Sequence, residues 1–188
     1  MARQADNPYQ APNAPVLATS DVATPRPMLY APATWKFLLL AVITFNFYLI
    51  VWFYRNWIRL RRVQKIDIWP APRAIFSPFT AYSCFERMEE VVAKRSGQRE
   101  VKFHAGTLAL IYFVLNAVGR LPAPFFLVSL LACLPVLAVN LKARAANQAA
   151  GDDLAKDDYL AWWSWMLIVL WAGFFALAMI GLTIPDRA

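Results

Sequence analysis

Four aspartates in the C-terminal third of the chain are the residues whose spacing could do chemistry. Asp153, Asp157 and Asp158 stand at i, i+4 and i+5, so a helix would place their carboxylates on one side, and Asp152 adjoins them. Clustered carboxylates suit cation binding or proton transfer. Because the segment lacks the alternating oxygen ligands of a calcium loop, we predict a solvated loop in which Asp157 or Asp158 caps the final helix.

The other reactive side chains are isolated in the sequence. His104 is the only histidine, and Cys84 and Cys133 are the only cysteines. A metal site needs several ligands at set spacings, and two distant cysteines make neither a zinc motif nor a disulfide framework. The sequence also has no glycine-rich phosphate loop and no nucleophile elbow. We predict that the protein is not an enzyme, that it holds no metal or cofactor, and that both cysteines are small buried or interfacial residues.

The elements that must position these residues are apolar helices. Of the 188 residues, 60% are hydrophobic, whereas soluble domains contain about 45–50%. An apolar stretch of about 20 residues matches the hydrocarbon thickness of a bilayer. We therefore predict an all-α polytopic membrane protein whose single domain covers residues 35–184. Its four or so transmembrane helices are expected over residues 35–54, 103–119, 123–141 and 160–184.

Two features of these apolar segments bear on their use. Pro135 lies inside the third segment and should kink that helix. No acid or base lies at the centre of any segment. Ion-coupled carriers usually place one there, so its absence counts against a proton-coupled transporter.

The positive charge is concentrated between the first two apolar segments. The net charge of the chain is +7, and residues 55–104 hold eleven Lys and Arg against five acids. This pattern is typical of a cytoplasmic loop, and no aromatic-interleaved nucleic-acid motif accompanies it, so we predict membrane lipids and not nucleic acid as partner. The side chains that we predict to contact anionic headgroups or a protein partner are Arg55, Arg59, Arg61, Arg62 and Lys65. The alternative is that these charges serve only as a topogenic signal.

A second amphipathic segment covers residues 74–95. Pro70 and Pro72 break any helix before it. Apolar residues such as Phe79 and Phe85 then recur at helical spacing opposite a polar stripe. We predict a helix that lies in the membrane plane or packs on the other helices. The alternatives are a re-entrant placement of residues 66–88 or a full span.

The N-terminal residues 1–34 include six prolines and are predicted to form a disordered tail. If residues 55–102 face the cytoplasm, four spans place both termini outside. An alternative is a re-entrant hairpin over residues 36–54, broken at Thr44-Phe45-Asn46, which would keep the N-terminus inside.

Asn140 and Asn147 stand seven residues apart, which is two helical turns, so they share one helix face. Two roles are open for this pair. The side chains could form hydrogen bonds near the end of the helix, or they could contact a lipid headgroup or a partner.

Several aromatic motifs follow one another along the chain: Thr44-Phe45-Asn46-Phe47-Tyr48, Trp52-Phe53-Tyr54-Arg55-Asn56-Trp57 and Arg73-Ala74-Ile75-Phe76. With Leu134-Pro135, Asn140 and Asn147, this pattern resembles a domain-of-unknown-function family of small bacterial integral membrane proteins, over roughly residues 28–182. Asn46 stands where that family has glycine at a bend. The resemblance implies a bacterial membrane protein and implies no activity.

These observations predict a non-enzymatic accessory or interaction protein of the bacterial inner membrane. It would contact anionic lipid, and a membrane-protein partner or a second copy of the chain. The alternative is a small oligomeric transporter or channel lined by Asn116, Ser129 and Asn140. A membrane enzyme lacks a visible catalytic set.

Overall fold

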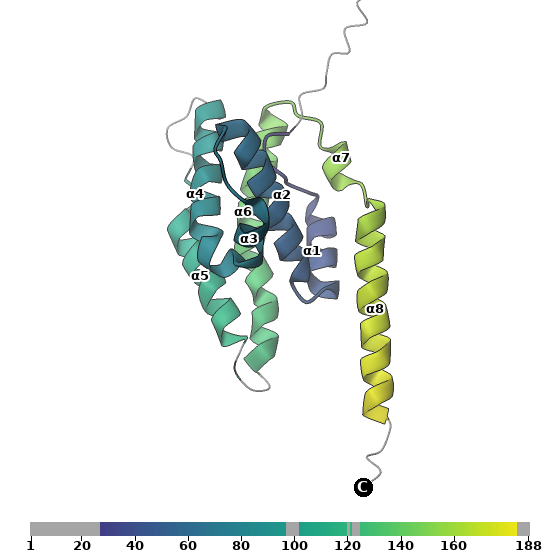
Figure 1. Cartoon of the computed structure of the whole chain (residues 1–188). Helices are drawn as coiled ribbons and strands as arrows, with labels where there is room; N and C mark the ends of the chain where they lie inside the picture. The colour runs from purple at the N-terminus through teal and green to yellow at the C-terminus, as the bar shows by residue number, and fades with distance from the viewer. Residues whose placement is uncertain (1–26, 97–101, 120, 122–124, 184–188) are drawn as a thin grey trace, which may run out of the picture.

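The computed structural model describes residues 27–96, 102–119, 121 and 125–183. Within these ranges the regular structure is helical and no strand occurs, so the predicted all-α class is confirmed. The helices are α1 (Thr34–Ile43), α2 (Phe47–Gln64), α3 (Pro70–Ile75), α4 (Ser77–Ser96), α5 (Ala105–Val118), the 3₁₀ helix η1 (Phe125–Ala132), α6 (Cys133–Ala149), α7 (Ala155–Asp158) and α8 (Trp162–Thr183) (Figure 1).

The continuous helix that we predicted over residues 35–54 is wrong, because the chain turns back on itself after α1. Phe45 and Asn46 have φ values of 48° and 67°, and left-handed residues cannot continue a right-handed helix. Asn46 also donates a 2.6 Å hydrogen bond from Nδ2 to the carbonyl of Ser129, which holds the tip of the turn against η1. The break at residues 44–46, which the sequence left open as an alternative, is the one that the structure contains.

The centre of the bundle is an aromatic core on α2. Trp52 is fully buried, and its ring meets Phe37 of α1, Phe53 of α2 and Phe85 of α4 edge-on. Such edge-to-face pairs stabilise a core by about 0.5–1.5 kcal/mol beyond the area that they bury. Trp52, Phe53 and Trp57 of the aromatic motif over residues 52–57 therefore form the interior against which the other helices pack.

The amphipathic segment predicted over residues 74–95 corresponds closely to α4, which packs inward through Ala81, Cys84 and Met88. Two details differ from the prediction. Pro70 begins the short helix α3, since proline fits the first helical position, where no backbone donor is needed. Phe79, which we assigned to the apolar face, is 70% exposed on the outer side of the bundle.

The hairpin of α5, η1 and α6 includes the helix that best fits a bilayer. Among the described residues, one helix is both long and apolar enough to cross a membrane, and it runs over the 22 residues Val128–Ala149. It extends well beyond the predicted end at residue 141. Pro135 lies in the first turn of α6, where its missing N–H breaks no helical bond. The predicted kink is thus replaced by the change from 3₁₀ to α geometry at Cys133.

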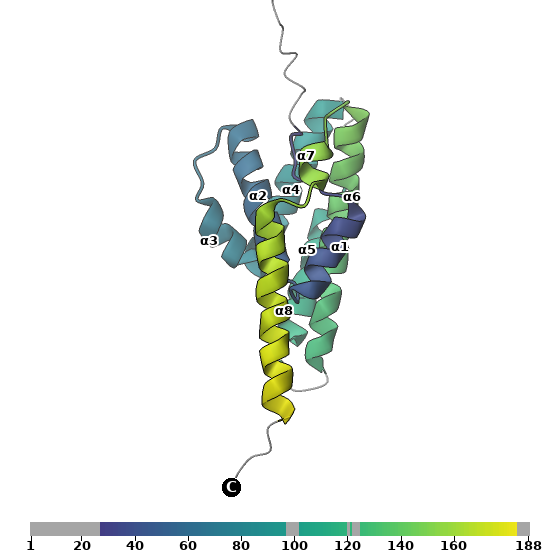
Figure 2. The same ribbon diagram turned by 90° about the vertical axis from the view of Figure 1, so that its right-hand side faces the viewer.

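Helix α8 lies at the edge of the bundle (Figures 1 and 2). The ring of its Trp171 packs on Phe45 and Phe47 at the α1–α2 turn, with centroids 6.4 and 5.0 Å apart. Most of its described side chains face outward, as with Trp162 at 73% and Val169 at 67% exposure. An apolar helix with so little protein around it needs an apolar environment.

Candidate functional site

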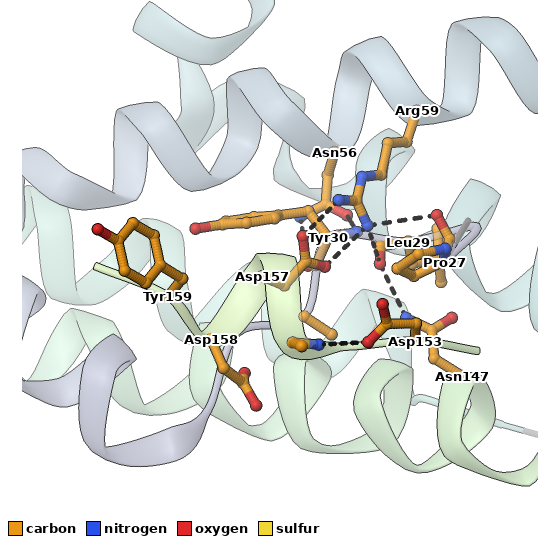
Figure 3. A network of polar contacts seen from close by, with 12 residues as sticks. Pro27, Leu29, Tyr30, Asn56, Arg59, Asn147, Asp153, Asp157, Asp158 and Tyr159 are labelled. Atoms are coloured by element: carbon orange, nitrogen blue, oxygen red, sulfur yellow. Dashed lines mark hydrogen bonds and ion pairs between the residues drawn. The ribbon is translucent and has the colours of Figure 1, made fainter. Parts of the chain in front are cut away.

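The most elaborate polar arrangement surrounds residues 27–33, which precede α1 in an irregular conformation. We predicted these residues to belong to a disordered tail, and that prediction is wrong: Leu29 is 1% exposed, and Tyr30 and Ala31 are fully buried. Residues 1–26 of the predicted tail lie outside the described residues. We call residues 27–33 the N-terminal segment, and Figure 3 shows part of the polar network around it, with Asn56, Arg59 and Asn147.

Every backbone carbonyl from Leu29 to Pro32 accepts a hydrogen bond from a side chain. Buried carbonyls must find donors, and this segment has no neighbouring strand to supply them. The donors come instead from α2 and α6, at 2.6–3.1 Å: Arg59 and Asn147 to Leu29, Asn56 to Tyr30, Arg144 to Ala31, and Asn140 to Pro32. Each bond stabilises the fold by about 0.5–1.5 kcal/mol net, whereas a missing partner would cost about 1–3 kcal/mol.

The side-chain amide of Asn56 bonds both backbone groups of Tyr30, as a neighbouring β-strand would do. Its Oδ1 accepts from the Tyr30 N–H at 3.0 Å, while its Nδ2 donates to the Tyr30 carbonyl at 3.1 Å. The Tyr30 hydroxyl lies 3.1 Å from that of Tyr48. Burial raises the pKa of Tyr30, so its hydroxyl keeps its proton and this contact remains a hydrogen bond.

The predicted shared face of Asn140 and Asn147 is confirmed, because both side chains point from α6 to the N-terminal segment. The alternative role, a contact with a headgroup or partner, is wrong for both residues, since Asn140 is 0% and Asn147 is 2% exposed. Asn140 also accepts from the indole nitrogen of Trp52 at 3.0 Å. This side chain therefore joins the N-terminal segment to the aromatic core.

Three of the four aspartates form two-bond ion pairs with arginines. Asp157 pairs with Arg59 at 2.5 and 2.9 Å, and the pairs of Asp158 with Arg144 and of Asp152 with Arg95 have bonds of 2.6–2.7 Å. The solvated loop that we predicted here is thus wrong, and the arginines explain why. The planar guanidinium fork matches both carboxylate oxygens, which compensates for burying them.

Neither Asp157 nor Asp158 caps α8 as predicted. Instead Asp158 accepts from the backbone N–H of Ala33 at 2.7 Å, directly before α1. The ammonium of Lys36 in α1 donates to the carbonyls of Asp157 and Tyr159 at 2.7 and 2.6 Å. The short helix α7 is thereby fastened to the start of α1, although more than 120 residues separate them.

The five basic residues predicted to contact lipid divide into two groups. Arg59 is engaged with Asp157, and the guanidinium of Arg55 lies 4.8 Å from the ring centre of Tyr30. Arg61, Arg62 and Lys65 are exposed near the C-terminal end of α2. The structure therefore brings the first two to the N-terminal segment and leaves the other three at the surface.

Sequence reasoning missed Tyr30, Lys36 and Asn56 as parts of this arrangement. One available signal was Asn56, an amide in the aromatic motif between Trp52 and Trp57. A buried amide in an aromatic helix face needs several partners, and the carbonyl of Trp52 one turn earlier accepts only one of its bonds.

The arrangement holds the N-terminal segment and α7 against the bundle. Within the described part of the chain, no group of three or more His, Cys, Asp or Glu is placed to hold a metal. Asp152, Asp157 and Asp158 are each already paired with a guanidinium group. Comparison with known proteins found no matching family model, no matching curated protein and no matching solved structure.

Proposed function

We propose that this chain is a non-enzymatic integral protein of the bacterial inner membrane, an accessory or interaction component with its polar end at the cytoplasmic surface. The observation that carries the proposal is the separation of polar and apolar parts. The ion pairs gather around α7 and the C-terminal ends of α4 and α6, at the upper end of the bundle in Figure 1. From there α8 extends to the lower end with apolar side chains exposed along it.

We infer three crossings of the bilayer, where the sequence predicted about four, and the lengths of two of the helices support this number. The helix over Val128–Ala149 has the required length and composition. The 22 residues of α8 give about 33 Å at about 1.5 Å per residue, enough to cross about 30 Å of hydrocarbon. Helix α5 has 14 residues and would cross with the help of the segments beside it.

The α1–α2 hairpin supports a shallow re-entrant element in place of the first span. Leu29 is bonded to Arg59, and Tyr30 to Asn56, so the two ends of this hairpin lie together at the polar end. A segment that crossed the bilayer would have its ends on opposite sides. In the topology that we propose, the N-terminus is cytoplasmic, and every Lys and Arg except Arg120 and Arg187 lies on that side.

Reporter fusions test this topology directly. A fluorescent protein fused before residue 1 should be fluorescent, because it folds in the cytoplasm. Alkaline phosphatase should be inactive before residue 1 and active after residue 188. Phosphatase activity at residue 1 would contradict the re-entrant hairpin, and recovery of the chain in the soluble fraction after an alkaline carbonate wash would contradict membrane integration altogether.

The interaction role rests on the exposed cations at the proposed cytoplasmic surface, and on the absence of a reactive set among the described residues. Native mass spectrometry after gentle extraction tests it. A stoichiometric second protein would support an accessory subunit and identify its complex. A defined homo-oligomer without lipid or protein partner would contradict this role.

A transporter or channel gains no support from the polar side chains expected to line it. Asn140 is bonded to Trp52 and Pro32 within one chain, and Asn116 donates to the carbonyl of Tyr112 in its own helix. A flux of ions or small solutes into proteoliposomes above the flux into empty liposomes would support the transporter or channel function.

A further inference from the structure

An open groove of about 690 Å³ runs along the outer side of α2 and is bounded by the chain that follows this helix. One part of its lining is cationic, with Arg61, Arg62 and Lys65. The other part is apolar, with Tyr54 and Ile58 on α2 and Ile66 and Pro70 beyond it. The groove thus combines three positive charges and the single carboxylate of Asp67 with an adjoining apolar wall.

The three cations are available, unlike the arginines at the N-terminal segment. Neither Arg62 nor Lys65 forms a side-chain hydrogen bond or ion pair with another described residue. Arg61 reaches Asp67 only at 3.8 Å, and these side chains are 52% and 94% exposed. An exposed pair of this kind contributes about 0–1 kcal/mol, so an anion can displace it at little cost.

The order of residues along α2 matches the depth profile of a bilayer leaflet. Tyr54 and Ile58 precede the cations by one to two turns, on the side toward the apolar half of the hairpin. Arg61, Arg62 and Lys65 follow toward the polar end. Trp69, 77% exposed just beyond the groove, is the residue type that favours the membrane interface.

We propose that this groove binds one anionic phospholipid, with its phosphate held by Arg61, Arg62 and Lys65 and an acyl chain along Tyr54 and Ile58. This inference rests on the membrane placement proposed above. It replaces a general attraction to anionic lipid by one defined lipid-binding site. The lipid and a free phosphate ion would both present a phosphate group to the three cations. The apolar wall favours the lipid, because a free ion would gain nothing from it.

Native mass spectrometry of the full chain in detergent, titrated with dioleoylphosphatidylglycerol, tests the site. Replacing Arg61, Arg62 and Lys65 together by Gln should weaken binding of the first lipid by about tenfold, through the loss of charge-assisted hydrogen bonds. The matched control replaces Lys94, Lys102 and Lys156 by Gln, which removes the same charge from exposed positions. Its affinity should stay within about twofold of the parent chain. Each variant should keep the thermal unfolding midpoint of the parent.

Two ligand comparisons complete the test. Deacylated glycerophosphoglycerol and inorganic phosphate should neither bind nor displace the lipid. Displacement by either would overturn the assignment to a lipid and indicate a soluble phosphate ligand. Equal weakening by both triple variants would overturn the site while leaving the membrane role intact. A parent chain that retains phosphatidylcholine as strongly as phosphatidylglycerol would contradict the anionic-lipid role itself.

Discussion

Arg59 and Asp157 stand 98 residues apart in the chain and meet in a two-bond ion pair, with the carboxylate side chain only 4% exposed. The same guanidinium donates to the carbonyl of Leu29 at 2.6 Å. One side chain therefore connects three regions of the fold: α2, α7 and the N-terminal segment.

Replacing Asp157 by Asn should destabilise the fold. The change leaves the Arg59 charge without its counter-ion; since Arg59 keeps some solvent access, we expect a loss of about 2–3 kcal/mol, near the lower end for broken buried pairs. In detergent this should lower the midpoint of thermal unfolding, followed by tryptophan fluorescence, by about 5–10 °C. The control is Asp153→Asn, which removes the same charge from an exposed bond to the nearby Ala155 N–H. Equal shifts for the two variants would contradict a special role for the pair.

Replacing Asn140 by Ala should cost more than a typical amide substitution. The change leaves the indole N–H of Trp52 and the carbonyl of Pro32 without these bonds in a buried environment, for a loss of about 2–5 kcal/mol. The comparison variant is Asn116→Ala, because the Asn116 amide donates to the carbonyl of Tyr112 in its own helix, four residues earlier. Thermal midpoints of the two variants should differ clearly, and a smaller shift for Asn140→Ala would show that its bonds contribute little.

The left-handed residue at the α1–α2 turn gives a test of backbone conformation. Asn46→Gly and Asn46→Ala both lose the side-chain bond to Ser129. Only alanine must also adopt a φ of 67° with a Cβ atom, which costs about 1–2 kcal/mol. We expect the glycine variant to unfold at the higher temperature. Equal midpoints would mean that the turn relaxes to another conformation.

Nested deletions isolate the contribution of the N-terminal segment. A chain lacking residues 1–33 should unfold well below one lacking residues 1–26, because the extra deletion removes the acceptors of Asn56, Asn140 and Asn147. The difference between the two midpoints should exceed that of any single substitution above. Indistinguishable midpoints would show that these buried amides find other partners.

The sequence predicted what depends on local periodicity. The all-α class, the amphipathic helix near residues 74–95 and the shared face of Asn140 and Asn147 all follow from residues within a few turns of one another. The ion pairs could not be predicted from the sequence. Arg59 and Asp157, for example, lie 98 residues apart, and only the folded bundle brings them together. The N-terminal segment was mistaken for disorder, since its prolines and small residues say nothing about donors on distant helices. The turn at Asn46 was visible as an alternative, where an asparagine tolerates a left-handed conformation.

The bonds to the N-terminal segment also set an order of events during synthesis. Ala33 leaves the ribosome early, but its partner Asp158 lies 125 residues later in the chain. At about 5–20 residues per second this is a delay of roughly 6–25 s. During that time the carbonyls of Leu29 to Pro32 lack most of their final donors and must be hydrated instead. Only after α6 and α7 have been translated can the segment dock, so the first part of the described chain to be made is among the last to reach its final position.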